Sequence, residues 1–140
     1  MALLCALSLA GCVDGDKGKA LGTAADRNTC VAQATPAATP YPSGFPAAWQ
    51  WPTGTVVFNV EDRGSTGVIA TGVTSTAFKD VLAFLNGPVS AAGYKVGKGE
   101  TEAHDAEANW DGNGYRGRWA IRESTTCPGE TVIQVLSTKH

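Results

Sequence analysis

The stretch AHDAEANWDGNGYRGRWAIRE, residues 103–123, decides the fold of this chain. Small or apolar residues alternate with polar ones on both sides of the segment DGNG at residues 111–114. Alternation with a period of two is typical of a half-buried β-strand, and glycine and asparagine accept the positive φ angles of a tight hairpin turn. The stretch therefore predicts an antiparallel hairpin of residues 103–110 and 115–123.

The position of the turn predicts the register of this hairpin. With residues 112–113 as a two-residue loop, Trp110 faces Tyr115 and Trp119 lies over Ala106. A slip of one residue would turn arginine side chains into the core, so the division into two faces is strongly specified. The apolar face carries Ala106, Ala108, Trp110, Tyr115, Gly117, Trp119 and Ile121, and the polar face carries Asp105, Glu107, Asn109, Arg116 and Arg118.

Four further stretches have the composition of strands or the alternation of a sheet face. Residues 55–60 are rich in β-branched and aromatic side chains, and alternation puts Val56, Phe58 and Val60 on one face. Residues 67–73 return after a polar turn, which predicts a second hairpin. Residues 94–98 and 131–137 are the remaining predicted strands.

Residues 75–92 change to the period of an α-helix. Thr74 or Ser75 is the expected N-cap, and Gly93 is the expected C-terminal stop. Pro88 has no N–H for the carbonyl four residues earlier, so we expect a kink there or two short helices that meet. The apolar face of this helix is formed by Phe78, Val81, Leu82, Leu85, Val89 and Ala92.

The order of these elements is ββαββββ. It predicts an α+β fold in which an antiparallel sheet of five or six strands carries one helix packed on one face. Five of the seven prolines lie between Pro36 and Pro52, so we expect regular structure to begin only after Pro52. Residues 13–29 lack apolar periodicity, and residues 31–43 are rich in Ala, Thr and Pro, which is the composition of a tether and an extended spacer.

The N-terminal run is uncharged and mostly apolar, and it ends in Leu9-Ala10-Gly11-Cys12. This ending resembles the lipobox of bacterial lipoproteins, in which an aliphatic residue, a small residue and Gly or Ala precede the modified cysteine. The resemblance implies lipid attachment to Cys12, cleavage before it, and a membrane anchor outside the cytoplasm. Eleven residues are too few to cross a bilayer, which takes about 20 in a helix. A buried apolar N-terminal strand or helix is the alternative.

The chain therefore divides into three predicted parts. Residues 1–11 are a lipoprotein signal peptide, residues 12–52 a lipidated N-terminus with a tether, and residues 53–140 the α+β domain. Two acyl chains on one cysteine hold a protein stably at a membrane, whereas a single chain gives only marginal binding.

The four cysteines then have distinct expected uses. Cys5 leaves with the signal peptide, Cys12 takes the lipid, and Cys30 and Cys127 pair in an oxidising compartment. Their disulfide would close a loop of 96 intervening residues, which the chain-entropy model values at about 4–5 kcal/mol. Two free thiols are the alternative.

Charge and motifs argue against several classes of function. Lys and Arg total 11 against 13 Asp and Glu, so the net charge of -2 gives no case for nucleic acid or an anionic membrane surface as partner. His104 and Asp105 point to opposite faces of a strand, His140 is the last residue, and residues 111–114 lack the further ligands of a calcium loop. We expect a monomer with no metal, no cofactor and no catalytic set.

Two groups of residues are candidates for binding. Arg116, Arg118 and Arg122 share one strand face and suit a carboxylate or phosphate, although pairing with Glu107 and Asp105 on a solvated face explains them equally.

Trp49 and Trp51, bracketed by prolines, suit stacking on a sugar, although a strap that buries both indoles in the core is the alternative. The leading hypothesis is a lipid-anchored, non-enzymatic binding module of the cell envelope, whose partner is an envelope protein or a glycan. A small-molecule or glycan binder with a pocket between helix and sheet is the alternative, and an envelope hydrolase is a third.

Overall fold

The hairpin of residues 103–123 forms strands β4 (Asp105–Gly112) and β5 (Tyr115–Glu123) in the computed structural model, which describes residues 28–140. The apolar face of the hairpin is buried, with Trp110 and Trp119 at 2% and 1% exposure. The register differs from the prediction by two residues: Trp119 lies opposite Ala108, not Ala106. A shift of two keeps every side chain on its face, so the apolar pattern does not distinguish the two registers.

The turn residues explain the corrected register. Asn113 and Gly114 form the loop, with φ angles of 53° and 83°, as a two-residue hairpin of this kind requires at both positions. Gly112 is instead the last residue of β4, where it passes against Gly93. The Asn113 side-chain amide donates a hydrogen bond to the Ala92 carbonyl at 3.0 Å, which fixes the turn against the segment before β3.

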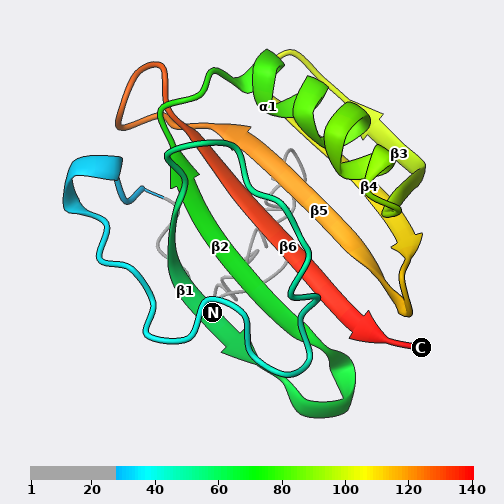
Figure 1. The fold of residues 1–140 in the computed structure, drawn as a ribbon. Coiled ribbons are helices and arrows are strands. Elements are labelled where there is room, and N and C mark those ends of the chain that lie inside the picture. Colours follow the sequence, from blue (N-terminus) through cyan, green and yellow to red (C-terminus); the bar gives the residue numbers. More distant parts are fainter. Residues whose placement is uncertain (1–27) are drawn as a thin grey trace, which may run out of the picture.

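The sheet has six strands, all antiparallel to their neighbours (Figure 1). Its spatial order is β1-β2-β6-β5-β4-β3, so the last strand of the chain is inserted between the two parts of the sheet. This arrangement confirms the α+β fold with one helix on an antiparallel sheet. The remaining strands are β1 (Val56–Asp62), β2 (Val68–Thr74), β3 (Lys95–Thr101) and β6 (Thr131–Lys139).

A β-bulge in β1 overturns the predicted alternation of this strand. The register with β2 shifts between Val57 and Asn59, which leaves Phe58 as the extra residue. Val57 is buried and Val60 packs against the core. The prediction that Val56, Phe58 and Val60 share one face is therefore wrong, because a bulge resets the period of two.

The predicted helix begins later than expected. Helix α1 (Phe78–Phe84) has Ala77 as its N-cap, without a side-chain hydrogen bond. Thr74, one of the two expected caps, is still paired with Thr131 in the sheet, and its hydroxyl accepts a hydrogen bond from the Thr76 N–H at 3.2 Å. The capping prediction was wrong because the strand continues through the residue that was assigned to the cap.

Pro88 lies in a π-helical turn, η3 (Leu85–Val89), which continues α1 without a break into two helices. The wider i→i+5 pattern carries the chain past a residue with no N–H to donate. Phe78, Val81, Leu85 and Val89 of the predicted face are buried, whereas Ala92, which was assigned to the same face, is exposed.

The segment before β1 crosses the same face of the sheet as α1 (Figure 1). We call residues 31–52 the strap; it starts with a short 3-10 turn, η1 (Val31–Gln33). Phe45 and Trp49 are each 2% exposed and belong to the core. The Trp49 ring lies 4.9 Å from the Trp110 ring, centroid to centroid. The folded unit therefore begins well before residue 53, because the aromatic side chains of the strap complete the core.

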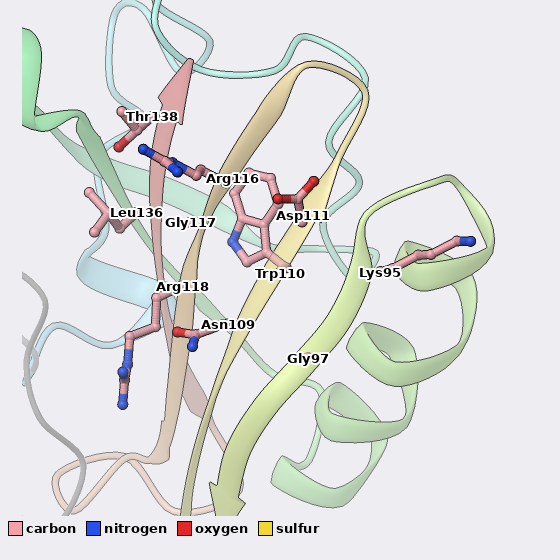
Figure 2. Close-up of a pocket in the computed structure, with 10 residues that line it drawn as sticks. All are labelled: Lys95, Gly97, Asn109, Trp110, Asp111, Arg116, Gly117, Arg118, Leu136 and Thr138. Atoms are coloured by element: carbon pink, nitrogen blue, oxygen red, sulfur yellow. The ribbon is translucent and has the colours of Figure 1, made fainter. Parts of the chain in front are cut away.

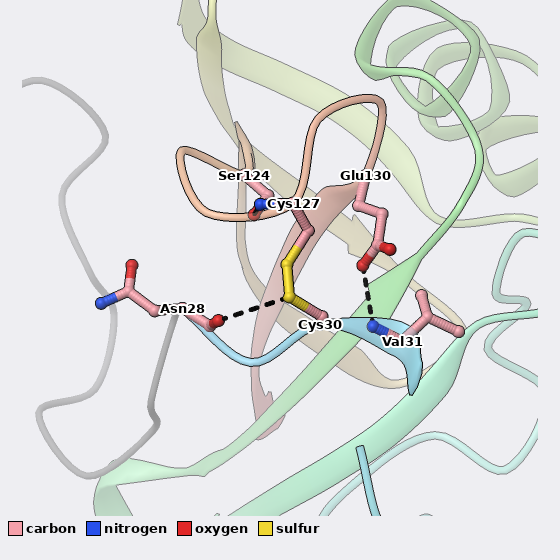
Figure 3. The surroundings of a disulfide bond; sticks show 6 residues. All are labelled: Asn28, Cys30, Val31, Ser124, Cys127 and Glu130. Atoms are coloured by element: carbon pink, nitrogen blue, oxygen red, sulfur yellow. Dashed lines mark hydrogen bonds between the residues drawn. A yellow bond between two sulfur atoms is a disulfide. The ribbon is translucent and has the colours of Figure 1, made fainter. Parts of the chain in front are cut away.

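The disulfide between Cys30 and Cys127 ties the start of the strap to the β5–β6 loop (Figure 3). The two α-carbons lie 5.8 Å apart, within the usual range for a disulfide. Beside it, the Val31 N–H donates to Glu130 Oε1 at 2.7 Å, and the Cys127 N–H donates to Ser124 Oγ at 2.9 Å. The expected cysteine pair is thus present, whereas Cys12 and the signal-peptide motif lie outside the described residues.

No helix within residues 28–140 combines the length and the apolar character that crossing a bilayer requires.

Candidate functional site

A hollow of about 470 Å³ lies on the sheet face opposite helix α1 (Figure 2). We call it the back hollow. Its charged and polar lining residues alternate along β4 and β5 with the buried residues of the core face, which is why they share the other face. The residues that line it are Lys95, Gly97, Asn109, Trp110, Asp111, Arg116, Gly117, Arg118, Leu136 and Thr138.

The cationic side chains of the back hollow do not converge on one point. In Figure 2, Arg116 extends toward Leu136 and Thr138, whereas Arg118 and Lys95 point in other directions. Arg118 also forms an ion pair with Glu107, one step diagonally across the β4–β5 ladder. Within residues 28–140, Lys95 and Arg116 have no ion-pair partner. The hollow therefore offers separate positive groups, not one anion clamp.

The structure separates the three arginines that the sequence grouped. Arg116 and Arg118 line the back hollow together, but Arg122 lies farther along β5, directly opposite Asp105. Lys95 joins the hollow from β3, where a bulge between Val96 and Gly99 shifts the register with β4. The sequence did not indicate Lys95, because its place depends on which strand pairs with β4.

His104 takes part in an exposed pair. Its Nδ1 lies 2.6 Å from Glu123 Oε2, and the two side chains are 76% and 47% exposed. His140 Nε2 lies 3.2 Å from Asp111 Oδ2, also at the surface. Surface pairs of this kind contribute about 0–1 kcal/mol to stability.

One group of three potential metal ligands occurs among the described residues. Cys30, Cys127 and Glu130 place one ligand atom each within 4.8 Å of one another. The two sulfur atoms are joined to each other, and one Glu130 oxygen accepts the Val31 N–H. In the oxidised state this group serves as the cross-link of the fold.

A larger hollow, of about 760 Å³, opens between the strap, the start of β1 and the end of α1. We call it the strap groove. The segments on either side of Phe45 and Trp49 form its walls, and these two side chains anchor the strap in the core. Its lining residues are Pro36, Ala37, Pro40, Tyr41, Trp49, Gln50, Trp51, Pro52, Thr53, Gly54, Thr55, Val56, Val57 and Phe84.

Two aromatic rings of the strap groove are held in place from behind. The Trp51 ring stacks on the buried Phe45 ring, with centroids 6.2 Å apart and planes 9° from parallel. The Tyr41 ring also packs near the Phe45 ring, with centroids 6.0 Å apart, and the Tyr41 hydroxyl donates a hydrogen bond to the Trp49 carbonyl at 3.2 Å. Burial raises the pKa of the Tyr41 phenol above its ordinary 10.0. The neighbouring Trp51 side chain lowers this pKa, but by less than burial raises it.

The two tryptophans named from the sequence have different environments. Trp49 is buried between Tyr94 and Trp110 and holds the strap down, whereas Trp51 is half-buried and lines the groove. Sequence reasoning missed Tyr41, although an aromatic residue between Pro40 and Pro42 is the same signal that singled out the tryptophans. Phe84 had no such signal, because it belongs to the helical pattern.

No protein-family model, curated protein or solved structure matches the chain.

Proposed function

We propose that this chain is a non-enzymatic binding module, held on the extracytoplasmic side of a membrane by a lipid on Cys12. The observation that carries the proposal is the disulfide between Cys30 and Cys127. Disulfides form and persist outside the reducing cytosol, so this bond supports the same compartment as the lipobox-like Leu9-Ala10-Gly11-Cys12. Residues between Cys12 and Cys30 then form the tether.

Binding is the role that the folded part supports best. The strap groove and the back hollow differ in chemistry, one aromatic and uncharged and the other carrying Lys95, Arg116 and Arg118. The volumes of both hollows fall within the range of small-ligand sites, about 300–1,000 Å³. An envelope protein or a glycan remains the proposed partner, and the strap groove favours the second candidate function, a small-molecule or glycan binder.

The anchor is tested by metabolic labelling with a clickable palmitate analogue, followed by intact-mass analysis of the membrane fraction. We expect label on the processed chain, which has lost residues 1–11, and complete loss of label in Cys12→Ser. Cys30→Ser is the matched control, because it removes a cysteine without touching the lipidation motif, and it should keep the label. An unlabelled protein that retains its initiating methionine contradicts the proposal.

A further inference from the structure

We infer that the strap groove is a binding site for an uncharged saccharide, stacked on Trp51 and Tyr41. The inference rests on the proposed binding function but not on the lipid anchor. The groove joins two features that saccharide binding needs: aromatic ring faces for the C–H side of a sugar, and neutral polar groups for its hydroxyls.

The aromatic faces are positioned before any ligand arrives. Trp51 is supported on one side by the Phe45 ring, which is itself 2% exposed, so the other side of Trp51 is the one that can line the groove. Tyr41 is 40% exposed, and its ring is fixed by Phe45 and by the hydrogen bond to the Trp49 carbonyl. Rings that are already held lose little conformational entropy on binding, which favours affinity.

The polar groups of the groove are neutral and available. Gln50 and Thr53 are exposed, and neither side chain has a hydrogen-bond partner within residues 28–140. Thr55 is committed, since its hydroxyl donates to the Pro52 carbonyl at 2.6 Å. The lining contains no Asp, Glu, Lys, Arg or His. A charged ligand would lose hydration here without gaining a counter-charge, so the groove selects against it.

A proline-rich peptide is the competing ligand for an aromatic groove. Aromatic grooves recognise the backbone carbonyls of such peptides with the N–H and O–H groups of their own rings, but here the indole N–H of Trp51 is buried and the Tyr41 hydroxyl already donates to the Trp49 carbonyl. Stacking of a sugar on the ring face needs no donor from the indole, and Gln50 and Thr53 line the same groove as possible partners of its hydroxyls. The groove therefore fits a saccharide better than a peptide.

The test uses the full chain carrying Cys12→Ser, so that binding is measured without a lipid. Tryptophan fluorescence and calorimetry follow titration with three neutral probes, triacetylchitotriose, cellotriose and maltotriose. We expect at least one of them to bind, with a change in Trp fluorescence. Tyr41→Ala should weaken binding about tenfold, and Gln50→Ala about fivefold, the losses expected for one stacked ring and one hydrogen bond.

Two further variants make the result specific to the groove. Tyr41→Phe keeps the ring and should retain most of the affinity. Arg116→Ala, in the back hollow on the other face, should leave binding unchanged. Binding of a proline-rich peptide in place of all three saccharides, no binding by any of them, or an equal loss in Arg116→Ala each overturns the inference. Failure of the palmitate labelling with saccharide binding intact removes only the anchor, and the reverse result removes only this site.

Discussion

Gly112 and Gly93 are in such close contact that a Cβ atom on Gly112 would lie 1.6 Å from the Gly93 carbonyl oxygen. This contact joins the end of β4 to the segment between η3 and β3. Position 112 therefore requires glycine because there is no space for a side chain. Gly114, in the turn, has open space, with no atom within 4 Å of the place where a Cβ would lie, but its φ is 83°. The two glycines of one turn are thus needed for different reasons.

Replacement of Gly112 should therefore cost more than replacement of Gly114. We expect Gly112→Ala to lower the free energy of unfolding by about 3 kcal/mol, the upper end for overpacking, because a carbonyl group must move. Gly114→Ala should cost about 1–2 kcal/mol, the strain of a positive φ alone. Chemical denaturation of both variants measures the difference, and equal losses would contradict the corrected register.

The disulfide should supply a large part of the stability. Removal of Cys30 and Cys127 together, by serine substitution, is expected to lower the free energy of unfolding by about 2–5 kcal/mol, because the open chain regains the freedom of a long loop. Denaturation with and without a reducing agent checks this. The wild-type protein should lose stability on reduction, and the double variant should show no response to the reductant.

The ion pair of Arg118 with Glu107 should matter little. The two side chains are partly exposed, Arg118 at 35% and Glu107 at 19%, and ion pairs that solvent still reaches contribute about 0–1 kcal/mol. Arg118→Ala is expected to change the free energy of unfolding by less than about 1 kcal/mol, and high salt should erase the difference. A loss of several kcal/mol would show that the back hollow depends on this arginine for its structure.

Tyr41 should titrate late. Burial raises the pKa of its phenol above 10.0, so the folded protein keeps the proton at pH values where the unfolded chain has released it. The unfolded state then binds fewer protons, and stability falls as the pH rises beyond 10. Absorbance at 295 nm, with Tyr41→Phe as the reference, follows the titration. A titration midpoint of Tyr41 below pH 10 would contradict a raised pKa.

The sequence predicted the kind and order of the main elements because two periods, 2 and 3.6, determine them locally. It failed where the outcome depends on how elements meet. The register of β4 and β5 differs because either turn keeps Trp110 and Trp119 on the core face. The bulge at Phe58 adds one residue, which no alternation predicts.

The strap shows the same limit for the candidate site. Composition alone classed residues 31–43 as a spacer, since Ala, Thr and Pro build no core. The aromatic residues Phe45 and Trp49 nevertheless reach the core, and their burial places Tyr41 beside Trp51. The tryptophans were recognisable as a candidate from their proline brackets, but the groove exists only once the strap lies against β1 and α1.

The cross-link also determines how the molecule carries a mechanical load. A pull on the chain ahead of Cys30 passes straight through the sulfur atoms to Cys127, and everything between these two residues is bypassed. When tension is applied between the chain ahead of Cys30 and the end of β6, the stretch after Cys127, which contains β6, bears the force directly. The strap lies between the two cysteines, so it carries no direct load when the molecule is pulled from its N-terminal side.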